Sequence, residues 1–412
     1  MKAKLISNKK LIVILISVLV ISNMGISFAY WASSITGDSE LMSADVSVGD
    51  FEYCEPIFTA QEFYDFATSS TSLSTDNYCL RNDIDFSSFT WEYLALHATN
   101  QFHGKFDGRN FTLSNITMET SASGTIYLSL FSRMDGGTIK NVKIENYGMG
   151  FTEAYYNSSS IQAGIFAGEV TGLNNLIENI TITNADVIGN VLNGAGGLVG
   201  QVEDDSDLTI RNVKATNLTV LSSSKRAGGL ISRVNPGTGI IIIEDIDLQG
   251  YIASDNAISN NGGIMGTFRS ATATLSRIMV EYIAEGSINL ADGTVAYKSN
   301  KYVGGFVGNN NNGSVMSIYD AFYTGELYNN ISYVGTVLGR KKADITLTNV
   351  YYSDVLFVDD YIPSSGSGII NSTVVNASSM PSNAWWNTFF VNFSTANSLW
   401  TQDVSGRPIL IR

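Results

Sequence analysis

Acidic side chains are the residues of this sequence that come nearest to a catalytic pattern. Cleavage of a polysaccharide needs two carboxylates, or a carboxylate and a basic residue, gathered on one face, often with Ca²⁺ beside them. Asp204, Asp205 and Asp207 lie close together in a predicted turn. Neighbouring repeats of the chain place no carboxylate at the same phase, so these residues lack the partner that the chemistry requires.

The other candidates also lack a catalytic arrangement. Asp83, Asp85 and Asp107 stand where acidic side chains usually cap turns by accepting backbone hydrogen bonds. The two histidines, His97 and His103, are not part of an HExxH motif, which excludes the common zinc-protease pattern. We therefore predict no catalytic residue, no metal site and no cofactor. A polysaccharide lyase or hydrolase is the alternative.

Cys54 and Cys79 are the only cysteines of the sequence. Without companion histidines they do not form a metal site. In an exported protein they can form a disulfide, which would stabilise that end of the fold by roughly 3 kcal/mol in the chain-entropy model. Two reduced, buried thiols are the alternative, and the sequence leaves both open.

The N-terminus has the pattern of an export signal. Residues 11–21 (LIVILISVLVI) are almost wholly apolar, and small residues follow up to a Ser-x-Ala cleavage pattern that ends at Ala29. Four lysines precede the apolar run: Lys2, Lys4, Lys9 and Lys10. We predict a signal peptide over residues 1–30. The alternative is an uncleaved membrane anchor, because residues 11–29 are nearly long enough to span a bilayer.

Residues 31–50 are predicted to be an extended segment. The stretches Ala29–Gly37 and Ser43–Gly49 resemble the signal segments of TasA- and camelysin-type proteins, which implies a Gram-positive lineage with a dedicated signal peptidase. Loss of the four lysines takes the formal net charge from −14 to about −18. This charge repels nucleic acid and anionic membranes, so the only membrane contact we expect is through an uncleaved signal segment. We expect a secreted or surface protein of a bacterium.

Composition and repeats together indicate the fold. Only 15% of the residues are charged, and 38 glycines stand against 5 prolines, which favours short strands joined by turns. A glycine-flanked apolar motif recurs at spacings of 31 to 42 residues. Its copies are Tyr127–Ser132, Ala163–Gly168, Ala195–Gly200, Ala227–Ser232, Asn261–Gly266, Val303–Gly308 and Val334–Gly339. No helix and no GxxxxGK[ST] motif follows the glycines, so they predict tight corners and not a phosphate loop.

A second motif, apolar-x-Asn-apolar, keeps phase with the first. Its third position is occupied by Asn115, Asn141, Asn179, Asn212 and Asn349, with Asp245 as a variant. Units with such period-two patterns bury their apolar faces only by stacking. We predict an all-β fold, a right-handed parallel β-helix (a solenoid) of about eight coils. The asparagines would form a structural ladder, with side-chain amides hydrogen-bonded along the axis.

The second position of this motif alternates in charge along the chain, from Lys140 to Glu178, Arg211 and Glu244. In stacked coils each charge would meet its opposite, which stabilises an exposed face slightly. A charged binding stripe, the alternative, would keep one sign.

Both ends of the repeats carry cap signals. Thr59 and Glu62 form a capping box that predicts a helix over residues 60–68, which we expect to cover the first coil. We therefore assign residues 51–125 to the N-terminal cap and first coils, 126–360 to the repeat β-helix, and 361–412 to a C-terminal cap. Aromatic residues gather in the last segment, at Trp385, Trp386, Phe389, Phe390, Phe393 and Trp400. They either plug the end of the coil or bind sugar rings.

The order of these motifs resembles the GLUG-repeat, pectin-lyase-like β-helix proteins of bacterial surfaces. The matching motifs are Thr59–Phe63, Tyr78–Phe86, Phe102–Gly108 and Phe111–Ile116, followed by the GGLVG units, over roughly residues 55–355. The resemblance implies the β-helix fold and a module that is not known as catalytic. The chain departs from the family pattern at Arg277, Ser317 and Gly335-Thr336.

A solenoid presents long lateral faces that commonly bind other molecules. We predict a non-catalytic surface or secreted repeat protein, with either adhesin-like binding or a structural role in an envelope or matrix. Glycans or host or cell-surface proteins are the expected partners, and the sequence indicates no oligomeric state. The candidate contacts are paired aromatics, Tyr155, Tyr156, Tyr351 and Tyr352.

Overall fold

The computed structural model describes residues 53–411, apart from 69–75, 90, 93–100, 121–124, 152–159, 190–193, 223–225, 236, 255–259, 286–301, 326, 328–332, 354–369, 378–386, 388, 392, 394–398 and 405–406. The signal segment and residues 31–50 lie outside the described residues, as do His97, Tyr155, Tyr156, Trp385 and Trp386. All described residues belong to one compact unit, Tyr53–Arg412.

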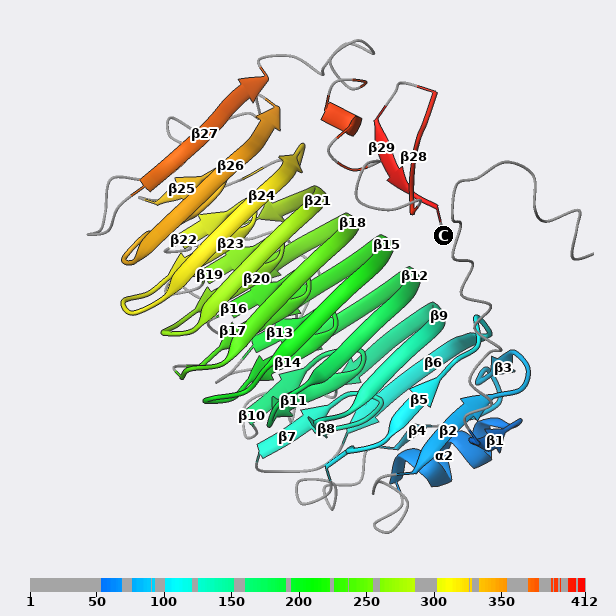
Figure 1. Cartoon of the computed structure of the whole chain (residues 1–412). Helices are drawn as coiled ribbons and strands as arrows, with labels where there is room; N and C mark the ends of the chain where they lie inside the picture. The colour runs from blue at the N-terminus through cyan, green and yellow to red at the C-terminus, as the bar shows by residue number, and fades with distance from the viewer. Residues whose placement is uncertain are drawn as a thin grey trace, which may run out of the picture. The chain divides into compact units, whose positions relative to one another are not determined.

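This unit is a parallel β-solenoid built from three sheets (Figure 1). Sheet A comprises β1 (Glu55–Ile57), β2 (Asn77–Leu80), β3 (Ile84–Asp85), β4 (Trp91–Glu92), β5 (Lys105–Asp107), β6 (Thr112–Thr120), β9 (Thr138–Phe151), β12 (Asn175–Gly189), β15 (Leu208–Ser222), β18 (Ile240–Ser254), β21 (Thr272–Glu285), β24 (Val315–Tyr323), β26 (Asp344–Ser353) and β27 (Ile370–Ala377). Sheet B comprises β8 (Arg133–Asp135), β11 (Ala167–Thr171), β14 (Val199–Val202), β17 (Ile231–Val234), β20 (Met265–Phe268) and β23 (Val307–Asn310). Sheet C comprises β7 (Thr125–Leu128), β10 (Ser160–Ala163), β13 (Gly194–Gly196), β16 (Arg226–Gly228), β19 (Asn260–Gly262), β22 (Tyr302–Gly304) and β25 (Val334–Gly335). Two antiparallel strands follow, β28 (Trp400–Gln402) and β29 (Pro408–Leu410).

Equivalent residues of successive coils face each other, which confirms the predicted fold class. Ile177 on β12, for example, pairs with Ile139 on β9 and with Ile210 on β15. In the described residues, six coils carry a strand in all three sheets, where the sequence predicted about eight. Two of the eight predicted coils are incomplete in the described residues. The strands before β7 all belong to sheet A, and the coil that contains β25 and β26 has no strand in sheet B.

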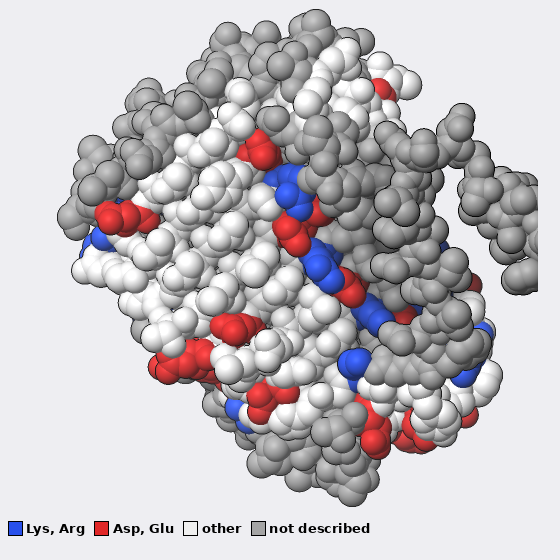
Figure 2. Space-filling model, in the orientation of Figure 1, with Lys and Arg blue, Asp and Glu red and all other residues white. Residues whose placement is uncertain are grey.

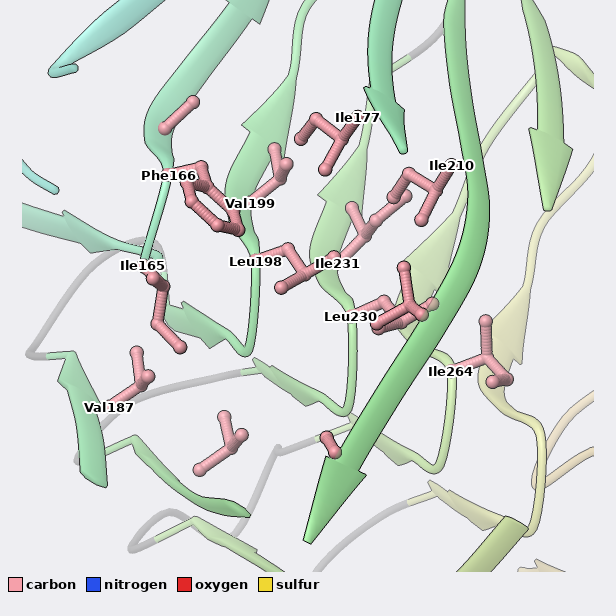
Figure 3. Packing of buried hydrophobic residues seen from close by; sticks show 14 of the residues in the cluster. Ile165, Phe166, Ile177, Val187, Leu198, Val199, Ile210, Leu230, Ile231 and Ile264 are labelled. Carbon is pink, nitrogen blue, oxygen red and sulfur yellow. The ribbon is translucent and has the colours of Figure 1, made fainter. Parts of the chain in front are cut away.

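The interior of the coils is a continuous apolar core. Sheet A contributes residues such as Ile177 and Ile210, and the corners between sheets C and B contribute Leu198 and Leu230 (Figure 3). All four side chains are fully buried. Each stabilises the fold by about 1.5–3 kcal/mol relative to an exposed position, which is why a repeat unit needs its neighbours.

Glycines allow the corners between sheets C and B to stack closely. A Cβ atom on Gly197 would lie 2.1 Å from the carbonyl oxygen of Gly229, and one on Gly229 would lie 1.9 Å from that of Gly263. Any side chain at these positions would collide with the backbone of the next coil. The glycine motif therefore marks close packing of coils.

Helix α2 (Ala60–Thr68) covers the N-terminal end of the core (Figure 1). Its capping box is formed as expected, since Thr59 Oγ1 accepts a bond from the Glu62 backbone N–H at 3.1 Å and Glu62 Oε2 accepts one from the Thr59 N–H at 3.1 Å. The ring of Phe63 packs against Phe106 and Phe131, whose centroids lie 5.6 and 6.3 Å away. The helix thus closes the first coils.

The two cysteines form a disulfide beside this helix. Cys54 precedes β1, Cys79 lies on β2, and the two strands are neighbours in sheet A. Of the two states that the sequence left open, the structure has the bonded one, which links strands on either side of α2.

Candidate binding surfaces

A column of asparagines runs through sheet A. Asn179 donates its side-chain amide to Asn141 Oδ1 at 2.8 Å, and Asn212 donates to Asn179 Oδ1 at 2.5 Å. All three have a left-handed backbone, with φ between 55 and 59°. Further along, Asn349 donates to Asp320 Oδ1 at 3.0 Å. The amides are used for bonds between coils, which makes this column structural.

Asn115 belongs to a second ladder, which corrects its predicted place beside Asn141. Strand β6 pairs with the second half of β9, so that Leu113 faces Ile144. Asn115 therefore donates to Asp85 Oδ1 at 2.9 Å and accepts a bond from Asn146 at 3.1 Å. The second ladder continues through Asn184 and Asn217. It had a sequence signal, because Asn146, Asn184 and Asn217 each follow a first-ladder asparagine by five residues.

The alternating charges lie in register on the exposed face of sheet A, as predicted. Glu178 pairs with Lys140 and Arg211 across the strands, and Arg211 Nη2 lies 2.7 Å from Glu178 Oε2. Arg277 extends the row, with Nη2 3.0 Å from Glu244 Oε2. Figure 2 shows the resulting stripe of alternating sign. Because each charge has an opposite neighbour, the stripe leaves little net charge for a ligand.

The acidic residues considered for catalysis hold turns. Five of their carboxylates each accept a hydrogen bond from a backbone N–H. The pairs are Asp83 with Thr112, Asp85 with Ser87, Asp107 with Arg109, Asp205 with Thr238, and Asp207 with Ile240. The bonds from Thr238 lower the pKa of Asp205, which is fully exposed. His103 Nδ1 lies 2.8 Å from the carbonyl oxygen of Asp135. Within the described parts of the chain, no group of three or more His, Cys, Asp or Glu residues is placed to hold a metal ion.

Tyr351 and Tyr352, which the sequence offered as candidate binding aromatics, are both partly buried against other residues. Both lie in β26. Tyr352 packs against the interior core, whereas the ring of Tyr351 lies 5.1 Å from that of Phe389. The strand turns one ring inward and the other toward the C-terminal segment, so neither ring is a free contact surface.

The C-terminal aromatics pack on the side of the solenoid, where the sequence predicted a plug at its end. Phe389, Phe393 and Trp400 form a second core with Met279 of β21 and Phe322 of β24. Met279 and Phe322 are paired neighbours on the outer side of sheet A. Apolar residues on an outward position create a face that must be covered, and the C-terminal segment covers it.

A strip of polar side chains, here called the polar seam, lies where sheets C and B meet. Its members alternate with core residues, as Glu169 does with Val170. In sheet C the seam contains Tyr127, Gln162, Arg226, Asn260 and Tyr302, and Gly194 takes the position between Gln162 and Arg226. In sheet B it contains Arg133, Glu169, Gln201, Arg233, Thr267 and Asn309.

Side chains from the two halves of the seam contact each other. The guanidinium carbon of Arg133 lies 5.3 Å from the ring centroid of Tyr127, and Asn260 Nδ2 donates to Thr267 Oγ1 at 2.9 Å. Gln162 and Gln201 are buried, yet the Oε1 atom of each has no hydrogen-bond partner among the described residues. Such an atom costs about 1–3 kcal/mol of stability, so the seam holds hydrogen-bonding capacity that the fold itself does not use.

Glu169 is the carboxyl residue among the described members of the seam. Burial raises its pKa, an effect that the Arg133 guanidinium opposes. Oε1 accepts bonds from Arg133, with Nε at 2.5 Å, and Oε2 accepts one from Gln201 Nε2 at 2.9 Å. Because both oxygens are engaged by neighbouring coils, the carboxylate binds the seam together and is poorly placed to transfer protons.

Sequence reasoning missed the seam. A signal was present, since polar residues recur seven positions apart on either side of the glycine corners, as in Gln162 and Glu169, Arg226 and Arg233, or Asn260 and Thr267. From the sequence alone, the glycine-rich strands indicate only corners.

Comparisons with known proteins support the fold and the repeat character. No family model matches the sequence. The chain is similar to Halomucin of Haloquadratum walsbyi, with 32% identity over 155 residues. The match covers 34% of this chain but only 2% of Halomucin. A crystal structure from Bacteroides ovatus, of a protein provisionally called an immunoglobulin A1 protease, has a TM-score of 0.52. The match covers 88% of this chain and 94% of that one at 17% identity, which shows the fold alone.

Neither relative supports the predicted Gram-positive lineage.

Among the residues that the structure describes, none of the helices has the length and apolar character needed to cross a membrane.

Proposed function

We propose that the protein is an exported surface or secreted repeat protein that binds glycans along the polar seam, and that it is not an enzyme. The predicted N-terminal signal supports export, and the similarity to Halomucin supports the repeat character. The resemblance to GLUG-repeat surface proteins belongs to the same proposal. The observation that carries it is the seam, with its buried but unpaired amide oxygens.

The chemistry of the seam suits sugars. Sugar hydroxyls both donate and accept hydrogen bonds, so they match the side-chain amides of Gln162 and Gln201. Both Oε1 atoms are enclosed, so the side chains would turn outward to meet a sugar. Tyr127, at one end of the sheet C half, is partly exposed, and its ring offers an apolar face with a polar tip. Tyr302, at the other end, is buried against Arg340 and Tyr333. Like positions repeat every ~4.8 Å along the stack, which suits an extended polymer better than a small ligand.

This arrangement favours adhesin-like binding over a purely structural envelope role. A structural rod gains nothing from buried amides without partners, because such groups reduce stability. The carboxylates that a lyase or hydrolase would need hold turns or, at Glu169, an ion pair.

The test is retention of the purified protein on immobilised neutral and acidic polysaccharides, with released unsaturated or reducing ends measured in the same samples. We expect retention without product release. Gln162→Ala should weaken binding about tenfold, ~1.4 kcal/mol, whereas Gln249→Ala on sheet A should leave it unchanged. Product release would show an enzyme, and absence of retention on every polysaccharide would overturn the proposal.

A further inference from the structure

Arg226 is a buried arginine without an acidic partner. It begins β16 and is 8% exposed. Its side chain makes no hydrogen bond or ion pair with any residue that the structure describes, and its Nε atom is fully enclosed. A guanidinium is always charged at neutral pH, so an enclosed one needs a compensating anion.

Three other arginines with largely buried side chains in the described chain have such an anion. Arg133, with a side chain 20% exposed, contacts Glu169. Arg277, at 16%, contacts Glu244 and Asp245, and Arg407, at 11%, contacts Glu281 at 2.8 Å. These pairs show how the fold normally stabilises a buried guanidinium. Arg226 departs from that pattern.

The neighbours of Arg226 make its environment more positive. Burial first, and then the charges of Arg233 and Arg269, lower the pKa of Arg226 to about 10. Arg233 and Arg269 are half-buried; Arg233 lies in β17 of sheet B, and Arg269 directly follows β20 of the same sheet. Arg269 Nε is likewise without a hydrogen-bond partner. Three guanidinium groups thus gather within a chain whose net charge is −14.

Nearby carboxylates compensate this charge only in part. Glu203 and Asp204 act on Arg233, and Glu169 acts on it more weakly. Glu203 Oε2 accepts a bond from Asn235 Nδ2 at 2.7 Å, and Asn235 Oδ1 accepts one from Arg233 Nε. Glu169 is already paired with Arg133. Among the described residues, the charges that act on Arg226 itself are those of Arg233 and Arg269.

We propose that Arg226, Arg233 and Arg269 form a site for the carboxylate or sulfate groups of an acidic polysaccharide. Planar guanidinium groups bind such anions through two parallel N–H bonds, which accounts for arginine at all three positions. The inference rests on the proposed glycan binding and names its substrate class. The unpaired Oε1 of Gln201, on the strand next to Arg233, would accept a hydroxyl of the same polymer.

The experiment measures binding of the full chain to polygalacturonate, dextran sulfate and neutral dextran, with free galacturonate and inorganic sulfate as small-anion arms. We expect the two acidic polymers to bind, and binding to weaken as salt rises from 50 to 200 mM. Arg226→Gln should weaken it at least tenfold. Arg211→Gln, which removes the same charge from the sheet A stripe, should change it less than twofold. Should Arg226→Gln fail to fold, Arg269→Gln tests the same site from a half-buried position.

Each other outcome has a distinct meaning. Equal losses for the Arg226 and Arg211 variants would show attraction by diffuse charge and overturn the site. Dextran binding that Arg226→Gln does not affect would overturn the anion site but leave the proposed glycan binding intact. If inorganic sulfate or free galacturonate saturates the site while neither acidic polymer binds, the proposal that the ligand is a polysaccharide is overturned. Binding of none of these would contradict both proposals.

Discussion

Trp400 donates its indole N–H to Oδ1 of Asp245 at 2.7 Å, across 155 residues of sequence. Asp245 occupies the asparagine column of sheet A, with φ of 57°, and also accepts a bond from Arg277 Nε at 2.7 Å. Replacing an amide of the ladder by a carboxylate therefore provides acceptors for both an arginine and a tryptophan. This contact holds the C-terminal strands against the flank of β15 and β18, where Lys214 Nζ also donates to the Leu410 carbonyl.

The asparagine ladder should contribute measurably to stability. Asn179→Ala removes one donated and one accepted hydrogen bond and places a Cβ-bearing residue without a polar side chain at φ 59°. We expect the free energy of unfolding to fall by about 2–4 kcal/mol. Asn179→Gly tolerates the left-handed backbone and should lose about 1–2 kcal/mol less. Urea denaturation measures both, and identical losses would show that the backbone conformation contributes nothing.

Coil stacking at the glycine corners can be tested with two alanine substitutions. In Gly197→Ala the new Cβ atom would lie 2.1 Å from the Gly229 carbonyl oxygen, which is backbone and cannot move aside. We expect a loss of about 3 kcal/mol. Gly148→Ala in β9 meets nothing within 4 Å, so the free energy of unfolding should stay the same or rise by about 0.5 kcal/mol. Equal thermal midpoints for the two variants would contradict the inferred contact.

The repeat architecture could be predicted from the sequence because stacking requires the same residue types at the same position of every coil. A glycine that meets the next coil and an asparagine that bends the strand must recur at a fixed phase, and both do. Asn115 was misplaced because two sheet A strands, β5 and β6, pair with different halves of β9, and the apolar-x-Asn-apolar pattern occurs at both bends. Spacing alone does not distinguish the halves.

The C-terminal docking and the polar seam depend on contacts that no local pattern fixes. Met279 and Phe322 take outward positions of sheet A and need to be covered, but many segments could cover them. The seam joins residues from two short strands whose angle is set by the glycine corner. Its side chains become neighbours only once the corner is formed, which is why Arg226 had no visible significance in the sequence.

Docking of the C-terminal strands should depend on pH through Asp247. Leu410 N donates to Asp247 Oδ2 at 3.3 Å, and Arg407 Nη2 lies 3.8 Å from Oδ1. Burial raises the pKa of Asp247, although the charges of Arg407 and Lys214 oppose the shift. In the unfolded chain the pKa of an aspartate carboxyl is about 3.9. A carboxyl whose pKa is higher than this in the folded protein contributes its full stabilising free energy when the pH is below the unfolded pKa. That contribution is lost as pH rises through the folded pKa.

We therefore expect protection of residues 399–411 from hydrogen exchange, corrected for intrinsic rates, to decrease as pH rises from about 3.9 through the raised pKa. Asp247→Asn removes the titrating group, so protection should become independent of pH in this window and match or exceed that of the wild type at pH 7. Asp205→Asn is the control, because its exposed carboxylate holds a turn at Thr238 and should leave the C-terminal strands unaffected. Loosening of these strands at pH 7 in Asp247→Asn would show that attraction to Arg407 outweighs the burial of the carboxylate.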